Sequence, residues 1–324
     1  MPSVITPPQI SPLAQGGGNR PFWSVAIPTY NAPAELLELA LRSVLDQAPG
    51  PEAMEILVVD DCSPQGGPAE LVKRVGGGRI QFYRNEKNLR LPGIWNDCIA
   101  RSRGKWVHIL HQDDYVLPGF YRQLAAAAER HPEVSLLATR SFYVDEEGII
   151  FGVSNRLKEL EQGGFSVESF FYETPILCAG VAIQRACYEK HGGFLPELVF
   201  KVDGEMWARA VGLGGGVMLP EVLSCYRLSR ASETGRLVCS GEDLRDMERF
   251  NEIFAGRYPR FDLKKARLKV CTLALEQAER FAANDNSEAA AASLKYWRAN
   301  APLRLRLRKA IGRVARSIFK QAVR

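Results

Sequence analysis

Two pairs of adjacent carboxylates, each placed directly after an apolar run, are the side chains best suited to carry chemistry. Asp60 and Asp61 end one run, and Asp113 and Asp114 end another. Two like charges held together repel each other unless a cation joins them, and hard divalent cations take oxygen ligands. The second pair precedes Pro118, the natural first residue of the next helix, by too many positions to cap that helix. Asp113 and Asp114 therefore predict a divalent metal site.

The first carboxylate pair has two interpretations. Asp side chains followed by Ser63-Pro64 are typical of a turn, whereas a carboxylate fixed here could also accept hydrogen bonds from a nucleotide base or ribose. The segment Ser24–Asn31 is similar, because an apolar strand stops at Pro28 and polar residues follow, as in any strand-to-helix turn. The chain has no G-x-G-x-x-G or G-x-x-x-x-G-K-[ST] motif, which argues against a dinucleotide oxidoreductase and a P-loop enzyme.

A third acidic group begins a predicted helix at Asp203 and Glu205. Acidic residues favour helix N-termini because of the helix dipole, so a structural role is one interpretation. Beside a metal site and a nucleotide pocket, however, a further carboxylate suits a general base that takes the proton of a substrate hydroxyl.

An α/β architecture must position these residues, because short apolar runs alternate with helix-like segments from Trp23 onward. We expect strands at Ser24–Pro28, Glu55–Asp60, Arg79–Tyr83, Lys105–His111, Val134–Arg140, Leu177–Ile183 and Val222–Leu228. We expect helices at Ala34–Gln47, Gly93–Ser102, Pro118–Arg130, Arg185–Lys190, Asp203–Val211, Leu263–Ala282 and Ser287–Trp297. Ligands bind outside the carboxyl ends of parallel strands, so the polar residues should meet there.

The length of 324 residues, with 46% hydrophobic and 24% charged residues, is typical of a folded, water-soluble protein. No apolar run is long enough to cross a membrane, and no secretory signal opens the chain. The seven cysteines are scattered without a C-x-x-C pair, which favours reduced thiols in the cytoplasm. Four regions are expected: a mobile leader (1–20), an α/β domain (21–240), a helical extension (241–300) and a basic amphipathic tail (301–324).

The positive charge of the chain belongs to its last part. Residues 289–324 contain ten Lys or Arg and no acid, so residues 1–288 hold 32 basic and 37 acidic side chains, a net charge of −5. Apolar residues between Leu307 and Ile318 recur on one side of a helix, with basic residues elsewhere around it. We expect 303–324 to lie on an anionic membrane surface or to pack on the main domain. Nucleic-acid binding is not expected, because no recognition fold accompanies the charge.

The motifs together resemble the family 2 glycosyltransferases, which have the GT-A fold. They follow in family order over about residues 22–230: Ser24–Asn31, Val58–Ser63, Asn85 and Asn88 to Trp95-Asn96, His111–Asp114, Gly192–Phe194, Asp203–Arg209 and Cys225–Arg227. The resemblance implies that 21–240 is a GT-A domain. It also implies an inverting enzyme that moves a sugar from a nucleotide sugar, most often a UDP-sugar, to a hydroxyl of a glycan or lipid-linked acceptor in polysaccharide or glycoconjugate synthesis.

The resemblance also assigns the donor site residue by residue. Pro28 and Tyr30 would line the nucleotide pocket, and Asp61 would accept a hydrogen bond from the base. Asn88 and Asn96 fall in the segment that borders the donor in the family.

The same carry-over covers the metal and the reaction. Asp113 would lie near the donor ribose, Asp114 would hold Mg²⁺ or Mn²⁺ on the diphosphate, and Asp203 would be the catalytic base. Relatives often have a His where this chain has Ser229, which leaves open what coordinates the metal besides Asp114. His111 is expected to pack or to form hydrogen bonds near the site. The alternatives are a nucleotidyltransferase and a non-catalytic protein that binds nucleotide sugars or glycans.

Overall fold

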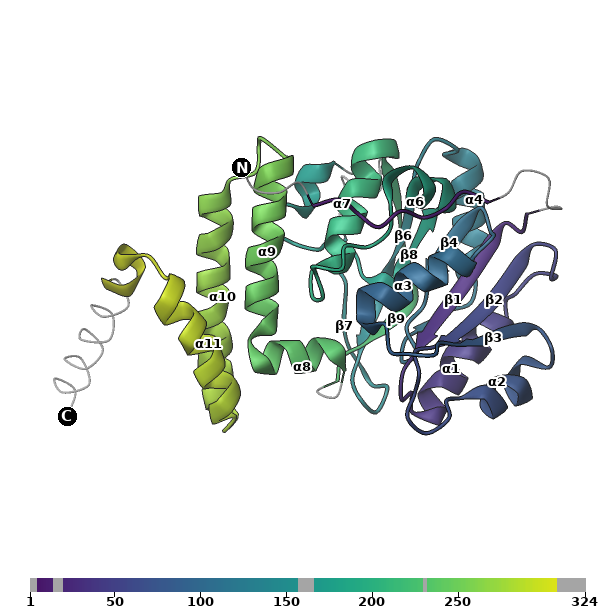
Figure 1. Ribbon diagram of the computed structural model, residues 1–324, viewed down its shortest axis with the longest axis horizontal. Helices are drawn as coiled ribbons and strands as arrows, with labels where there is room; N and C mark the ends of the chain where they lie inside the picture. The colour runs from purple at the N-terminus through teal and green to yellow at the C-terminus, as the bar shows by residue number, and fades with distance from the viewer. Residues whose placement is uncertain (1–4, 14–19, 157–165, 230–231, 308–324) are drawn as a thin grey trace. The chain divides into compact units, whose positions relative to one another are not determined.

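The computed structural model describes residues 5–13, 20–156, 166–229 and 232–307 (Figure 1). The chain forms two compact units, Met1–Ser232 and Glu233–Arg324. The first unit contains the whole sheet and every candidate site residue, and the second is helical. The predicted boundary at residue 240 therefore lies within the second unit, where Glu233–Ser240 already forms helix α8.

A mixed sheet forms the centre of the first unit, with the strand order β3-β2-β1-β4-β8-β6-β9-β5 and with β7 paired to β6. The strands are β1 (Trp23–Thr29), β2 (Met54–Asp60), β3 (Ile80–Arg84), β4 (Trp106–Ile109), β5 (Tyr115–Val116), β6 (Leu136–Val144), β7 (Ile150–Val153), β8 (Val181–Gln184) and β9 (Gly216–Arg227). Strands β3, β2, β1 and β4 run parallel, whereas β8 is antiparallel to β4 and β6. Strands β6 and β9 also pair parallel, so the predicted mostly parallel α/β sheet is confirmed.

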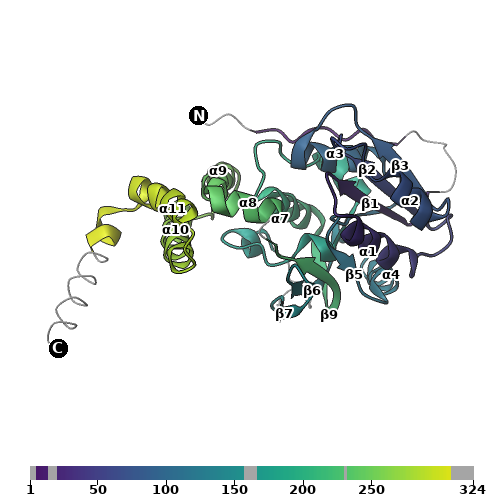
Figure 2. The same ribbon diagram turned by 90° about the horizontal axis from the view of Figure 1, so that it is seen from below.

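Helices cover both faces of this parallel half. They are α1 (Ala34–Leu45), α2 (Ala69–Gly76), α3 (Arg90–Arg101) and α4 (Phe120–Arg130), followed by α6 (Arg185–His191) and α7 (Val202–Gly214). Leu37, Leu41 and Val44 of α1 and Phe120 of α4 pack in one buried cluster with the strands. Figure 2 shows α1 and α4 on one side of β1 and β2 and α3 on the other. Every residue of β1 and β2 is buried, in agreement with their mostly apolar sequences.

In its described part, the second unit contains the helices α8, α9 (Glu242–Arg257), α10 (Leu263–Ala283) and α11 (Ser287–Asn300). Asp262 and Asn286 cap α10 and α11, because their side chains accept hydrogen bonds from the first-turn N–H groups. Among the described residues, no helix is sufficiently long and apolar to span a bilayer. The predicted amphipathic tail falls mainly on residues 308–324, which lie outside the described part of the chain.

Several details differ from the prediction. Helix α4 begins at Phe120 rather than at Pro118, because Gly119 takes a φ of 95° immediately before it and closes the turn there. The two-residue strand β5, the edge strand β7 and the short helix α2 were not predicted. The two strands are too short to show a hydrophobic period.

The beginning of the chain also differs from the expected mobile leader. Within the described residues 5–13, the side chain of Ile10 is only 3% exposed. The Pro8 carbonyl accepts a hydrogen bond from the Gly193 N–H at 2.8 Å, and the Ser11 carbonyl accepts one from Arg185 at 3.3 Å. This segment, which we call the N-terminal strap (residues 5–13), thus supports the loop after α6.

Candidate active site

Parallel pairing brings the polar ends of β1, β2 and β4 to one edge of the sheet. Thr29 at the end of β1 pairs with Asp60 at the end of β2, and the N–H of Asp61 donates to the Thr29 carbonyl at 2.8 Å. The N–H of Leu110, just after β4, donates to the carbonyl of Ala26. The residues that follow these strands therefore lie together, as predicted from the sequence.

The turn after β1 is held by a side chain that the sequence analysis did not single out. Gln112 accepts a hydrogen bond from the Tyr30 N–H at 2.8 Å and donates one to the Tyr30 carbonyl at 3.2 Å. Pro28 is buried in β1, whereas the ring of Tyr30 is 44% exposed. An exposed ring on a fixed backbone can stack against a planar base.

Asp60, the last residue of β2, stabilises the loop that follows this strand. Its buried carboxylate accepts hydrogen bonds from the N–H and the hydroxyl of Ser63, and it forms a 2.5 Å ion pair with Arg84. The guanidinium of Arg84 also donates to the Ser63 carbonyl. The turn interpretation of Asp60 is therefore confirmed.

Asp61 is only 2% exposed and organises the next loop along the chain. Its carboxylate accepts hydrogen bonds from the N–H groups of Leu89 at 2.9 Å and Arg90 at 3.0 Å and from the Asn85 amide at 3.2 Å. It thereby caps the start of α3, where Arg90 has a φ of 62°. The Asn88 side chain also accepts a hydrogen bond from the Arg90 N–H. These contacts show a positioning role for Asp61, and its contact with a base stays a prediction.

Asn96 connects α3 to the loop after α6. Its side chain accepts a hydrogen bond from the Phe194 N–H at 2.7 Å and donates one to the Phe194 carbonyl at 2.9 Å. From the other side, the Arg209 guanidinium donates to the carbonyls of residues 191–193 and pairs with the buried Glu205. Asn96 thus fixes backbone in this structure, and its predicted place beside the donor is a separate proposal.

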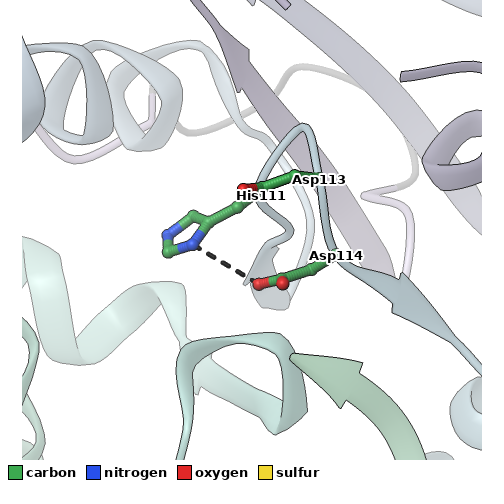
Figure 3. A group of neighbouring side chains, drawn as sticks. All are labelled: His111, Asp113 and Asp114. Atoms are coloured by element: carbon green, nitrogen blue, oxygen red, sulfur yellow. Dashed lines mark ion pairs between the residues drawn. The ribbon is translucent and has the colours of Figure 1, made fainter. Parts of the chain in front are cut away.

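The second carboxylate pair lies in a group with an imidazole. His111, Asp113 and Asp114 offer ligand atoms within 4.8 Å of one another. In Figure 3 the ring of His111 and the carboxylate of Asp114 point toward each other, with Nδ1 and Oδ2 3.5 Å apart. The other Asp114 oxygen accepts a hydrogen bond from the Arg227 N–H at 2.8 Å. The sequence analysis placed His111 near the site but not among the metal ligands, although its spacing of three residues from Asp114 in a turn was visible.

Burial and mutual repulsion shape the charges here. Burial and the neighbouring Asp114 raise the pKa of Asp113 to about 6. Burial alone would lower the pKa of His111, but Cys178 and Asp114 raise it well above its usual value. Burial raises the pKa of Asp203, while Lys201 and His111 oppose this rise.

Asp203 and Asp114 share an electrostatic neighbour, the thiol of Cys178. Asp203 and the His111 ring act on each other electrostatically, and both Asp203 and Asp114 act on the buried Cys178 thiol, whose pKa is raised by burial. Asp203 is the second residue of α7, where its carboxylate accepts a hydrogen bond from the Gly204 N–H at 2.6 Å. The metal candidate and the base candidate therefore share the neighbours Cys178 and His111, and their place in one active site stays a prediction.

The donor set fits a divalent cation. Asp114 is 1% exposed, yet its Oδ2 atom has no hydrogen-bond partner among the described residues. A buried carboxylate oxygen without a donor is costly, and a cation would satisfy it. Carboxylates and an imidazole are ligands that Mn²⁺ and related ions accept.

Comparison with known proteins assigns the family. The profile of "Glycosyl transferase family 2" matches residues 24–190, which is more than half of the chain. The chain belongs to this family. The matched range of this glycosyltransferase contains strand ends β1, β2 and β4 and the His111–Asp114 segment, while Asp203 lies beyond it.

Two curated relatives illustrate the range of similarity to this glycosyltransferase. An uncharacterized protein of Mycobacterium tuberculosis is 28% identical over 261 residues, covering 76% of this chain and 79% of its own. The succinoglycan biosynthesis protein ExoO of Rhizobium meliloti is 31% identical over 109 residues, covering 34% of this chain and 30% of its own.

Solved structures support the GT-A fold of this glycosyltransferase. Staphylococcus aureus TarS 1–349, in complex with UDP-GlcNAc, has a TM-score of 0.53 at 15% identity, covering 85% of this chain and 91% of its own. The mannosyltransferase PcManGT of Pyrobaculum calidifontis, in complex with GDP-Man and Mn²⁺, has a TM-score of 0.54 at 19% identity, covering 96% of this chain and 82% of its own. At these identities the likeness concerns the fold alone.

Proposed function

We propose that this glycosyltransferase uses a nucleotide sugar, a UDP-sugar in the first instance, and transfers the sugar with inversion to a hydroxyl of a glycan or lipid-linked acceptor in polysaccharide or glycoconjugate synthesis. The observations that carry the proposal are the buried Asp114 oxygen, which has no hydrogen-bond donor among the described residues, and the electrostatic neighbour Cys178 that Asp114 shares with Asp203. TarS binds UDP-GlcNAc, PcManGT binds GDP-Man, and ExoO takes part in succinoglycan synthesis, all of which support this choice.

The donor lies across the carboxyl ends of β1, β2 and β4 in this proposal. The exposed Tyr30 ring stacks on the base beside Pro28, and Asp61 contributes its remaining acceptor capacity. Asp113 reaches the ribose. The loops with Asn88 and Asn96 border the sugar, and both are fixed to backbone by their amides. These positions explain why a nucleotide could bind without rearranging the backbone.

The transfer itself is a single displacement. Asp203 accepts the proton of the acceptor hydroxyl as this oxygen bonds to the anomeric carbon and the bond to the nucleotide diphosphate breaks on the opposite face. Asp114 would hold a divalent cation, which would neutralise the charge that develops on the leaving diphosphate. The raised pKa of Asp203 makes its carboxylate a better proton acceptor than an ordinary Asp.

A substitution at the base separates chemistry from binding. Asp203→Asn is expected to lower the transfer rate by about 10²- to 10⁴-fold and to leave nucleotide binding, measured as thermal stabilisation by UDP or GDP, unchanged. Asp97→Asn is the control, because Asp97 pairs with Arg101 on the surface of α3. Full activity of Asp203→Asn, or absence of stabilisation by every nucleoside diphosphate tested, contradicts the proposal.

A lipid-linked acceptor would place the enzyme on a membrane surface on the cytoplasmic side. Exposed Leu303 and Leu307 begin the basic segment 303–324, of which residues 308–324 are not described. Removal of 303–324 should abolish co-sedimentation with anionic vesicles and spare binding of UDP. Equal vesicle binding by the shortened protein would refute this membrane contact.

A further inference from the structure

We propose that His111 is itself a metal ligand, through Nδ1, and that this nitrogen gives the site a preference for Mn²⁺ over Mg²⁺. The inference rests on the proposed function, because the cation concerned is the one that Asp114 would hold. It adds a residue and a selectivity that neither the family match nor the sequence motifs provide.

The distance between the two side chains is the first argument. A charge-assisted N–H···O hydrogen bond is typically about 2.7–2.9 Å long. The Nδ1 atom of His111 is 3.5 Å from Oδ2 of Asp114, which is too long for such a bond. Two atoms that each lie about 2.1 Å from one ion, at angles between 90° and 110°, are about 3.0–3.5 Å apart. The observed separation therefore suits two ligands of a shared cation.

The surroundings of Asp114 are the second argument. Its Oδ1 atom is satisfied by the backbone N–H of Arg227, which leaves Oδ2 directed at the imidazole. The guanidinium of Arg227 donates instead to the carbonyls of Asp113, Asp145 and Glu146. In the described part of the chain, His111 is thus the only group that forms an ion pair with this buried carboxylate. A cation bound between His111 and Asp114 would provide a partner for both side chains.

The imidazole is held in place to act as a ligand. Its ring stacks on Trp95, which is 2% exposed, with 5.1 Å between the ring centroids and 21° between the planes. Trp95 also packs edge-on against Phe194, whose backbone is bound by Asn96. A ring fixed by packing loses little entropy when it binds a metal.

The nitrogen ligand decides the selectivity. Mg²⁺ demands an octahedral shell of oxygens and gives up its waters reluctantly, whereas transition-metal ions such as Mn²⁺ accept imidazole. A site made of carboxylates alone would not distinguish the two ions in this way. His111 should therefore raise the affinity of the site for Mn²⁺ relative to Mg²⁺.

The experiment uses the full-length protein and two variants. In His111→Asn, the amide oxygen takes nearly the position of Nδ1, so an oxygen replaces the nitrogen. His131→Asn is the matched control, because the partly exposed His131 ring pairs with the exposed Glu133 at the end of α4, outside the His111–Asp114 group. Binding of Mn²⁺ is titrated by electron paramagnetic resonance, alone and with UDP or GDP, and Mg²⁺ is measured by competition. Pulsed resonance on bound Mn²⁺ detects directly coordinated imidazole nitrogen.

We expect wild type and His131→Asn to bind Mn²⁺ with an imidazole ¹⁴N signal. His111→Asn should lose that signal and lower the ratio of Mn²⁺ to Mg²⁺ affinity by about tenfold or more. Bound Mn²⁺ without an imidazole signal in the wild type refutes the inference even if His111→Asn fails to fold, and it leaves the proposed function intact. An unchanged affinity ratio in a folded His111→Asn refutes it equally. If wild type binds neither ion with any nucleotide, the metal-dependent part of the proposed function fails as well.

Discussion

Replacement of Asp61 by Ala tests whether this residue organises the site before any nucleotide binds. The variant removes the acceptor of the Leu89 N–H and of the Asn85 amide and one of the two acceptors of the Arg90 N–H, which keeps its bond to Asn88. The start of α3 then has no cap from β2. We expect the protein without ligand to lose stability, whatever Asp61 does for the base.

The size of the loss follows from these three contacts. Hydrogen bonds to charged groups contribute about 1.5–3 kcal/mol each, and water can replace part of them because Arg90 is exposed. A net loss of about 3 kcal/mol is therefore expected. The first unit spans Met1–Ser232, and for a domain of that size 1 kcal/mol lowers the Tm by about 2–4 °C. The Tm should fall by roughly 10 °C.

Thermal unfolding of wild type, Asp61→Ala and the control Asp97→Ala, each with and without UDP, measures this effect. Asp97 is an acid of α3 whose ion pair with Arg101 is partly exposed, so its removal should change the Tm by no more than about 2 °C. If Asp61→Ala melts within that same range, the capping argument is wrong. If it melts early but UDP still stabilises it as strongly as it does the wild type, the predicted contact with the base is wrong.

Three further predictions concern other buried groups. Burial raises the pKa of Asp243 in α9 to about 6, so between about pH 4 and 6 the native state holds a proton that the unfolded chain releases. The free energy of unfolding therefore falls as the pH rises through this range, by roughly 3 kcal/mol at pH 7. Denaturant titrations at pH 5 and 7.5 measure this fall, which Asp243→Asn should abolish. Glu205→Gln leaves the buried Arg209 without its charge partner and should cost about 3 kcal/mol by the same titration, while identical midpoints would contradict it. In Gly193→Ala the new methyl group overlaps Asn96, so the Tm should drop by several degrees, whereas Gly256→Ala, in open space on α9, should not lower it.

The sequence was sufficient for the features that depend on local pattern. Strands β1 and β2 are buried runs of apolar residues, and parallel pairing of such runs places their polar ends together. The order of the motifs identified the family, and the structure brings His111, Asp113 and Asp114 together. These conclusions required only the spacing of hydrophobic residues along the sequence and the rule that parallel strands end at one edge of a sheet.

Other features depend on contacts between distant residues, and no local pattern reveals them. The N-terminal strap has the Pro-rich composition of a mobile end, yet the Pro8 carbonyl accepts a hydrogen bond from the N–H of Gly193, far along the chain. The amide of Asn96 likewise meets Phe194 across 98 positions. The bridge from Gln112 to Tyr30 spans 82 positions. Partners this far apart in the chain are known only when the fold is known.

These distant contacts share one form, in which a side chain binds the backbone of a loop rather than another side chain. Gln112 does so for Tyr30, Asn96 for Phe194, and Asp61 for the start of α3. A loop held in this way keeps its conformation whichever side chains it carries. Gln112 and Asn96 therefore fix the loop backbone, while the side chains of Tyr30 and His111 are left to bind ligands. Substitutions of Gln112, Asn96 or Asp61 should therefore first lower the free energy of unfolding. Substitutions of Tyr30 or His111 should instead weaken ligand binding and leave the free energy of unfolding nearly unchanged.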